Sequence, residues 1–232
     1  MWCCLVGSEM CIRDRIIGGV YTKSDATGDI HKYCFELAKV LEKKYEVDFK
    51  FSETIKDIKK SNKPILQTNK NEYEFDDIIL CTGVETERFR RKFGDSFRIY
   101  PVKGYSVTVD LEDDKSRESA PFVSLLDDPS KLVASRLGNR LRVAGTAELA
   151  GYNKDIRSNR IKPLLNWIND LFPEVNTKNY LPWTGLRPMS SDMVPIIRES
   201  KRKNVFYNSG HGHLGWTMGT YSGKLAADLV DQ

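Results

Sequence analysis

The stretch NVFYNSGHGHLGWTMG, residues 204–219, joins an apolar run to a glycine-rich loop and then to the start of a helix-like segment. Gly210, Gly212 and Gly215 have the G-x-G-x-x-G spacing of a dinucleotide-binding loop. That motif needs a second strand and an acidic residue about 20 positions further on, but the sequence ends at Gln232. We therefore expect no complete dinucleotide site at this loop.

Two interpretations of the loop stay open on composition alone. Glycine lets a backbone approach a planar ligand closely, and the N–H groups at a helix start favour negative charge. Gly215, Gly219 and Gly223 also recur at every fourth position, which predicts a bare helix face suited to close packing on a strand. The loop is therefore either a ligand-binding element or a tight helix–strand contact without a ligand.

The composition narrows the class of protein. The 232 residues are 40% hydrophobic and 29% charged, with a formal net charge of +4, which is typical of a soluble globular chain. Basic residues alternate with acidic ones, so we expect no nucleic-acid partner. The apolar runs are shorter than the roughly 20 residues of a membrane-spanning helix. The five cysteines form no C-x-x-C pair, which favours a reduced, cytoplasmic protein.

The first fifteen residues, MWCCLVGSEMCIRDR, have neither helical nor strand periodicity. The part LVGSEMCIRDR also resembles translated sequencing-adapter DNA. We therefore expect residues 1–15 to be a non-native tail, in which case the front part of the protein is missing; the alternative is a genuine but irregular N-terminus.

Periodicity assigns elements to the next eighty residues. Helical spacing from Ile30 to Tyr45 predicts a helix with an apolar stripe, and alternation over residues 47–51 predicts a half-buried strand. A hairpin is expected to turn between Asn69 and Asn71. The stretch DIILCTG, residues 77–83, is apolar on both faces, which suits a buried parallel strand that ends at a ligand cleft.

The pattern then changes to a succession of strands. Four strand-like runs lie between residues 97 and 149, with EDDKSRES, residues 112–119, expected to be a loop. Successive strands predict an antiparallel sheet and a second layer or domain. A helical stripe follows from Ile161 to Phe172, with Pro163 near its first turn or at a break. The predicted helices, the parallel strand and the antiparallel sheet together make the predicted fold class α/β (α+β).

Several longer stretches resemble one family. From Gly18 onward, the chain is similar to the later part of the D-amino acid dehydrogenases, in the FAD-dependent family that includes glycine oxidase and sarcosine oxidase. The stretches that carry the resemblance are GGVYTKSDATGDIHKY, YPVKGYSVTV, RVAGTAELAGYN, WTGLRPMSSDMVPII and VFYNSGHGHLGWTMGTYSGKLAADLV. The last two are the most specific.

The resemblance implies a particular domain organisation. It implies a truncated FAD-binding, Rossmann-like domain made of residues 16–95 and 182–232, which lacks the N-terminal unit that binds the ADP half of FAD. Residues 96–181 would form an antiparallel-sheet substrate domain. The implied cofactor is FAD.

The resemblance also implies a set of cofactor-binding residues. Ile55 would lie along the adenine, Thr82 and Gly83 would approach from the sheet, and the glycine loop would run beside the isoalloxazine ring. There the helix-start N–H groups would stabilise charge on the N1–C2=O edge of the reduced flavin. The loop residues implied are Gly210, Gly212, His213, Leu214, Gly215, Trp216 and Thr217.

On the substrate side, the resemblance implies that Arg187, in GLRP, clamps the substrate carboxylate. Tyr105 and Tyr152 are weaker candidates, and packing within the sheet is the alternative for both. His211 and His213 have no surrounding ligand cluster, so we expect no metal site.

The implied reaction is oxidative deamination of a D-amino acid to a 2-oxo acid and ammonia. A hydride would pass from the α-carbon to flavin, and the electrons would then go to a quinone or another acceptor. That acceptor implies peripheral association at the inner face of the plasma membrane. We expect this fragment alone to be inactive. The alternatives are an oxygen-using amino acid or glycine oxidase of the same fold, and a non-catalytic packing domain.

Overall fold

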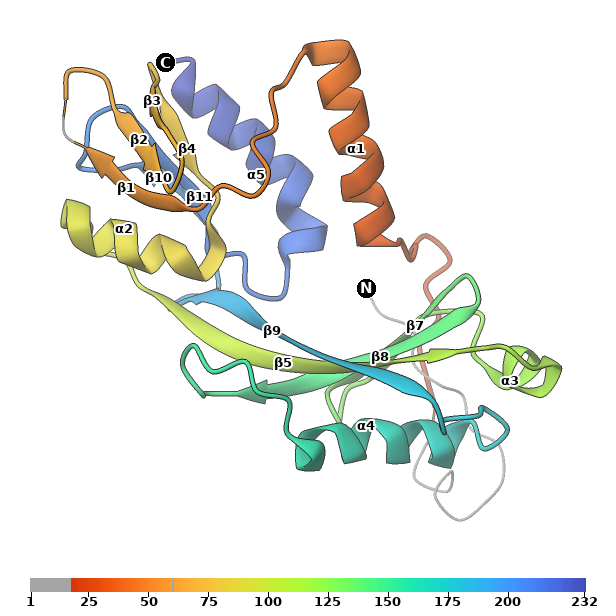
Figure 1. Cartoon of the computed structure of the whole chain (residues 1–232). Coiled ribbons are helices and arrows are strands. Elements are labelled where there is room, and N and C mark those ends of the chain that lie inside the picture. The colour runs from red at the N-terminus through yellow and green to blue at the C-terminus, as the bar shows by residue number, and fades with distance from the viewer. Residues whose placement is uncertain (1–17, 60) are drawn as a thin grey trace. The chain divides into compact units, whose positions relative to one another are not determined.

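The structure is a computed structural model that describes residues 18–59 and 61–232 (Figure 1). The expected tail, residues 1–15, lies outside the described residues. The chain divides into two compact units. Unit 1 contains Lys103–Leu186 and the described residues up to Ile30, and unit 2 contains His31–Val102 and Arg187–Gln232.

Unit 1 is built on a five-stranded sheet with the order β6-β7-β8-β5-β9. The pairs β6–β7, β7–β8 and β5–β8 are antiparallel, which confirms the antiparallel sheet that the strand-like runs predict. The strands are β5 Ile99–Asp110, β6 Leu125–Asp127, β7 Leu132–Leu137, β8 Arg140–Glu148 and β9 Tyr180–Ser190.

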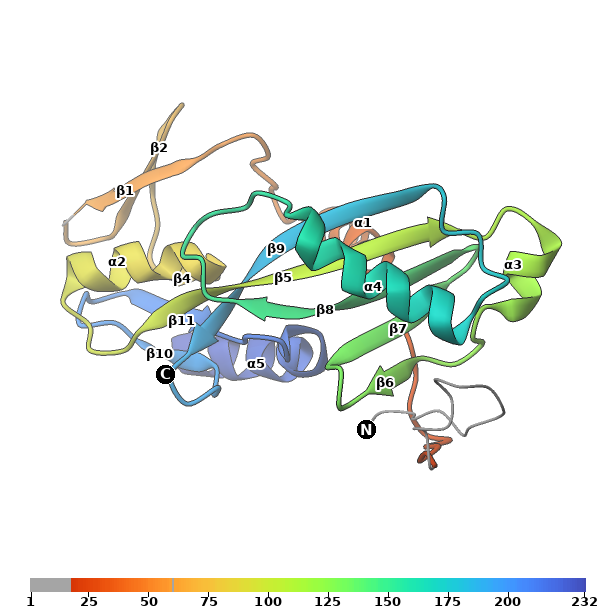
Figure 2. The ribbon, with the colours of Figure 1, turned by 90° about the horizontal axis from the view of Figure 1, so that it is seen from below.

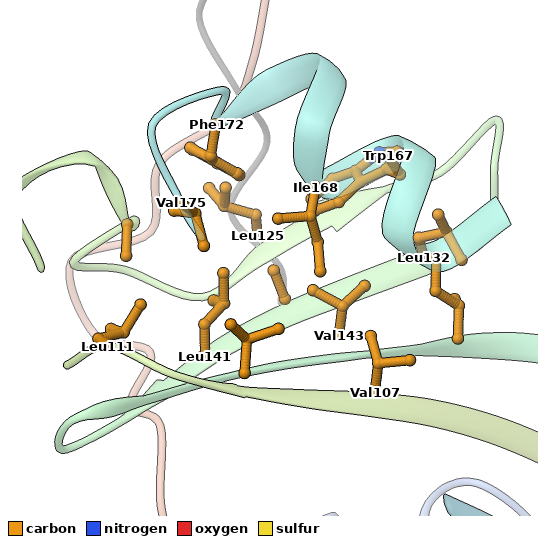
Figure 3. Close-up of a cluster of buried hydrophobic side chains, with 14 of the residues drawn as sticks. Val107, Leu111, Leu125, Leu132, Leu141, Val143, Trp167, Ile168, Phe172 and Val175 are labelled. Atoms are coloured by element: carbon orange, nitrogen blue, oxygen red, sulfur yellow. The ribbon is translucent and has the colours of Figure 1, made fainter. Parts of the chain in front are cut away.

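Helix α4, Ser158–Leu171, covers one face of this sheet (Figure 2). Apolar and polar residues alternate along β5 and β8, so one face of each strand is apolar and packs against the helix. Figure 3 shows Trp167 and Ile168 facing the strand side chains in this core. Pro163 lies inside α4 and does not break it, although its missing N–H removes one intrahelical hydrogen bond.

The expected loop at residues 112–119 is wrong. Helix α3, Asp114–Ser119, forms there. The Asp113 carboxylate caps it by accepting a hydrogen bond from the Ser116 N–H at 2.8 Å. A local cap of this kind satisfies a helix-start N–H, and it stabilises a single short helix without any apolar periodicity.

Unit 2 contains two three-stranded sheets. One is the antiparallel meander β1-β2-β3, and the other has the order β10-β11-β4, with β4 and β11 parallel. The predicted hairpin between Asn69 and Asn71 is confirmed by the β2–β3 pair. The strands are β1 Ile55–Lys59, β2 Ile65–Thr68, β3 Glu72–Glu74, β4 Ile78–Leu80, β10 Ile196–Glu199 and β11 Val205–Ser209.

Two helices of unit 2 each follow a strand of the β10-β11-β4 sheet. A 3-10 turn, η2 Gly83–Glu85, leads directly from β4 into α2 Thr86–Phe93, and α5 Gly215–Val230 packs against β10 and β11. The core of this unit consists of Ile58, Ile78, Leu80, Phe89, Val205 and Tyr207. The parallel strand expected in DIILCTG is confirmed as β4. Its burial on both faces is not observed, because Ile79 is 40% exposed.

Two further expectations need correction. Residues 47–51 form no strand, and the Phe49 and Phe51 rings instead stack at 5.6 Å, since no neighbouring strand pairs with this segment. Helix α1, Ile30–Tyr45, is confirmed, but none of its residues is buried, so its apolar stripe does not join either core.

Candidate functional site

The carboxyl ends of β4 and β11 meet through a chain of hydroxyl groups. Thr82 and Thr86 share a hydrogen bond of 2.9 Å, and Thr86 donates to the Ser209 hydroxyl at 2.9 Å. Ser209 in turn donates to the Gly83 carbonyl at 3.2 Å. Because the strands are parallel, their ends lie at one edge of the sheet. Thr82, Gly83 and Gly210 are therefore brought together.

The glycine loop is held against the end of β9. Gly210 and Gly212 have φ angles of 77° and 57°, a backbone conformation that glycine adopts without strain. The Gly212 N–H donates to the Pro188 carbonyl at 2.9 Å, and Met189 forms an antiparallel bridge with His211. A Cβ at Gly212 would lie 2.6 Å from Met189 Sδ. The positive φ is what favours glycine at this position, because the flexible end of the Met189 side chain could move aside for a Cβ.

Helix α5 begins directly after the loop. Leu214 is its N-cap residue and provides no side-chain hydrogen bond. The N–H groups of Gly215, Trp216 and Thr217 come before the first i−4 acceptor inside the helix, so they concentrate the positive end of its dipole. His213, Trp216 and Thr217 have exposed side chains. The helix start can therefore stabilise a negative charge.

His211 links the glycine loop to helix α5, a contact that the sequence did not predict. Its Nε2 lies 2.8 Å from the Ser222 hydroxyl in α5, and Ser222 donates its own hydrogen to the Gly219 carbonyl. His211 Nε2 is therefore the donor to Ser222. Burial lowers the pKa of the imidazole, which favours its neutral form. The sequence gives only a histidine between two glycines, and nothing local indicates Ser222 as its partner.

Arg187 immediately precedes the residues that hold the loop. It is partly buried, and burial lowers the pKa of its guanidinium, which still remains charged at neutral pH. Pro188 and Met189 contact Gly212 and His211, so the chain places Arg187 next to the anchored part of the glycine loop. Arg187 and the glycine loop, the two strongest candidates from the sequence, thus lie in one region of unit 2.

The glycine face of α5 does not form the tight contact that one interpretation of the loop expected. In the described part of the chain, a Cβ added at Gly219 or Gly223 would meet no heavy atom within 4 Å. At Gly215 the nearest atom would be His211 Cβ, at an ordinary 3.6 Å. Close packing therefore does not explain these glycines.

Ile55 lies in the β1-β2-β3 sheet, whereas Thr82 follows the end of β4 in the other sheet of unit 2. It begins β1, and its carbonyl accepts a hydrogen bond from Arg88 at 3.0 Å. Its side chain packs against the core of unit 2, which includes Leu80 of β4 and Tyr207 of β11.

The two tyrosine candidates belong to unit 1 and differ in environment. Tyr105 is 1% exposed and donates to Glu148 Oε2 at 2.6 Å, whereas Tyr152 is 53% exposed. The hydrogen bond from Tyr105 is the main cause that lowers the pKa of Glu148, and Arg157 adds to it. Tyr105 is thus part of a buried polar network.

Fully buried Lys103 completes that network. Its Nζ donates to the Asp155 carbonyl at 2.6 Å and to Asn153 Oδ1 at 3.1 Å, and it lies 3.6 Å from Glu148. These contacts hold the segment between β8 and α4, which carries Tyr152.

Within residues 18–59 and 61–232, no helix has the length and hydropathy needed to cross a bilayer. In the same residues, no three histidine, cysteine, aspartate or glutamate side chains gather as metal ligands.

Comparison with known families decides the class. The family model described as DAO, FAD dependent oxidoreductase, matches residues 7–229. The chain belongs to the DAO family. This membership agrees with the family resemblance of the glycine loop and the GLRP stretch.

Curated relatives of this DAO-family chain share one name. It is 44% identical over 229 residues to D-amino acid dehydrogenase 3 of Mesorhizobium japonicum, covering 97% of the chain and 55% of the relative. It is 38% identical over 222 residues to D-amino acid dehydrogenase of Paramagnetospirillum magneticum, covering 94% and 52%. The chain thus spans about half the length of the curated relatives that it matches.

Solved structures support the DAO fold. L-proline dehydrogenase from P. horikoshii matches with a TM-score of 0.80 at 16% identity, covering 94% of this chain and 59% of that chain. Glycine oxidase from Bacillus cereus matches with a TM-score of 0.67 at 22% identity, covering 77% and 50%. At these identities the likeness concerns the fold alone.

Proposed function

We propose that this chain forms part of an FAD-dependent enzyme that oxidatively deaminates D-amino acids to 2-oxo acids and ammonia. One observation carries the proposal. The glycine loop is anchored on Pro188 and Met189, next to Arg187 and at the start of α5. An anion-stabilising helix start and a desolvated guanidinium therefore share one anchored region. The 44% identity to a D-amino acid dehydrogenase supports the choice of substrate.

The residues present fit FAD. Gly210 and Gly212 keep the backbone free of side chains, and the open glycine face of α5 leaves room beside the loop. The candidate cofactor residues are those of the loop and helix start, together with Thr82, Gly83 and Ile55. Bound FAD would supply the acceptor for a hydride from the substrate α-carbon. The α5 start would then stabilise negative charge on the reduced ring.

Arg187 would orient the substrate. A guanidinium meets a carboxylate through two parallel hydrogen bonds, which fixes both the position and the rotation of the amino acid. Tyr152, on the segment held by Lys103, and Tyr105, within the buried network, are the further substrate-side candidates. The amine must be neutral when the hydride leaves, and the resulting imine then hydrolyses to the 2-oxo acid.

The proposal also includes the division into domains, the electron acceptor and the location in the cell. Residues 16–95 and 182–232 would form the FAD-binding part, and residues 96–181 the substrate part. The electrons would pass to a quinone or another acceptor, at the inner face of the plasma membrane in the cytoplasm.

A chimera tests this function. The chain would replace the matching segment of the Mesorhizobium japonicum relative, which supplies the remaining length. We expect the purified chimera to hold FAD and to reduce an artificial dye when D-amino acids are added, but not with L-amino acids. A folded chimera that holds FAD yet ignores D-amino acids would contradict the proposal. Oxygen consumption at the same rate as dye reduction would favour the oxidase alternative.

A further inference from the structure

A groove with a volume of about 900 Å³ lies within unit 2, away from the glycine loop. Its walls come from the end of β1, the end of α2 and the turn between β10 and β11. That turn leads into the amino end of β11, whereas Gly210 follows the carboxyl end of the same strand. The five residues of β11 span roughly 17 Å, so the groove and the candidate cofactor site are well separated.

The side chains that line the groove are mainly basic. They include one acidic residue, Asp57, and five basic residues, which are Lys59, Lys92, Lys201, Arg202 and Lys203. Lys92 pairs with Asp57, and Lys59 pairs with Glu72 outside the lining. The basic side chains at positions 201–203 pair with no carboxylate in the part of the chain that the structure describes. The groove therefore carries an excess of positive charge.

Hydrogen bonds to backbone carbonyls hold the walls of the groove together. The Arg202 guanidinium donates to the Lys59 carbonyl at 2.8 Å, and Lys201 Nζ donates to the Gly94 carbonyl at 2.8 Å. The buried Asp95 carboxylate accepts a hydrogen bond from the Lys201 N–H at 2.9 Å, which ties the turn to the end of α2. A carbonyl has a dipole but no net charge, so these contacts order the cations without neutralising them.

Lys203 adds a positive charge without an internal partner. It is exposed, and it makes no hydrogen bond or ion pair within residues 18–59 and 61–232. Exposed Ser61 and Asn62 add hydrogen-bond donors to the lining. A cleft lined by charges of one sign focuses their field and concentrates ions of the opposite sign. The volume lies in the range of roughly 300–1,000 Å³ that small-molecule pockets occupy.

We propose that this groove binds a ligand that carries two or more phosphate groups. Arginine and lysine both donate charge-assisted hydrogen bonds to phosphate oxygens, arginine as a planar fork and lysine as a point charge. More than one phosphate is needed because the basic residues come from three separate segments around a groove of small-molecule size. The phosphates belong either to a soluble diphosphate or to neighbouring lipid headgroups, which present the same chemistry. Neither flavin nor an amino acid takes part in this site, so it is independent of the proposed function.

Calorimetric titration of the 232-residue chain tests the site. The probes are inorganic diphosphate, inorganic phosphate and chloride, compared at one ionic strength because salt screens exposed charges. We expect saturable binding of diphosphate, binding of phosphate that is weaker by about 10-fold or more, and no binding of chloride.

Cosedimentation with phosphatidylcholine vesicles, with and without phosphatidylglycerol, then distinguishes the two sources of phosphate. Binding to the phosphatidylglycerol vesicles that diphosphate displaces would identify lipid headgroups. Diphosphate binding without such displaceable vesicle binding would identify a soluble ligand.

Matched variants locate the bound anion. The double variant Lys201→Gln, Lys203→Gln should weaken diphosphate binding by about 10-fold or more, because it removes two charged donors from the groove. The control Lys43→Gln, Lys44→Gln removes the same charge from the exposed last turn of α1, outside the groove lining, and should change the affinity little.

Three results would overturn the inference. They are the absence of saturable diphosphate binding, equal affinities for diphosphate and phosphate, and an affinity that the groove variant changes no more than the control variant does. If the double variant loses its circular dichroism spectrum, Lys203→Gln decides, because this side chain has no internal contact to lose. Unchanged diphosphate affinity in folded Lys203→Gln would then place the anion outside the groove.

Discussion

Arg187 shows how a single residue combines burial with charge. Its guanidinium is partly desolvated, and the next residue accepts a hydrogen bond from the glycine loop. Charge-assisted hydrogen bonds are stronger away from water, so a carboxylate bound there would be held firmly.

We predict that Arg187→Ala in the chimera lowers kcat/KM for D-amino acids by about 10- to 1000-fold, from charged hydrogen bonds of about 1.5–3 kcal/mol each. Arg187→Lys should also lose activity, because it lacks the fork. Flavin content should stay normal. Steady-state dye reduction and the flavin spectrum are the measurements. Near-normal kcat/KM in a flavin-loaded Arg187→Ala variant would place the carboxylate contact elsewhere.

Glu87 links the stability of unit 2 to pH. Burial alone would raise the pKa of Glu87, but hydrogen bonds from Arg90, from the Ile99 N–H and from Arg91 outweigh it and lower the pKa to about 2. The usual value is 4.5. A lowered carboxyl pKa adds stability that is fully present above pH 4.5 and is lost as the pH falls towards 2.

We predict that Glu87→Gln lowers the free energy of unfolding by about 2–3 kcal/mol at pH 7. The difference from the unmodified chain should shrink as the pH falls from about 4.5 to about 2. Urea unfolding at a series of pH values measures both effects. Exposed Glu85→Gln, two positions earlier, is the control and should change little. A Glu87→Gln effect that is the same at every pH would show that packing, not charge, is responsible.

At the scale of elements, the loop and helix from Gly210 to Val230 use glycine in two different ways. Gly212 has a positive φ and contacts Met189, whereas Gly219 lies in the interior of α5 with open space around it. A methyl group should therefore have opposite effects at the two positions.

We predict that Gly212→Ala destabilises unit 2 by about 1–3 kcal/mol, from the strain of a positive φ at a residue that carries a Cβ. Gly219→Ala should stabilise it by about 0.5–1 kcal/mol, since alanine favours a helix interior. Thermal unfolding followed by circular dichroism compares the two variants directly. Destabilisation by Gly219→Ala would mean that the glycine face of α5 packs on something after all.

Lys103 organises the connection between β8 and α4. Because it is fully buried, its ammonium depends on Asp155, Asn153 and Glu148 for solvation. Removing one partner from a buried charged network leaves the others uncompensated.

We predict that Lys103→Met destabilises the chain by about 3 kcal/mol. It should also speed amide hydrogen exchange in residues 149–156, the segment that Lys103 holds. Exchange mass spectrometry and urea unfolding report the two effects. Lys162→Met on the exposed side of α4 is the matched control and should alter neither.

At the scale of the whole molecule, α1 leaves an apolar surface exposed. Leu37 and Val40 lie one turn apart and are 40% and 48% exposed, and no residue of the helix is buried. Contiguous exposed apolar side chains promote association in water.

We predict that the double variant Leu37→Lys, Val40→Lys self-associates less than the unmodified chain in sedimentation velocity over a concentration series. Glu42→Lys changes the net charge by the same two units without removing apolar surface, so it should have a smaller effect. An equal decrease in self-association for the two variants would show that net charge, not the apolar surface, controls association.

The local sequence determined the helices and strands that show a helical or alternating hydrophobic pattern within their own residues. Helices α1, α4 and α5, the β2–β3 hairpin and the strands β5, β7 and β8 follow from helical or alternating patterns within short windows. The glycine loop and the strand ends at Thr82 and Gly83 were likewise predictable, because glycine and strand-terminal residues mark such positions directly.

Only the tertiary structure decided which segments meet. Residues 47–51 alternate like a strand but find no partner, and the stripe of α1 joins no core. The contacts of His211 with Ser222, of Gly212 with Pro188 and of Arg142 with Trp183 join residues that are distant in the sequence. Local periodicity reports which face of an element is apolar, whereas the partner of that face depends on how the whole chain packs.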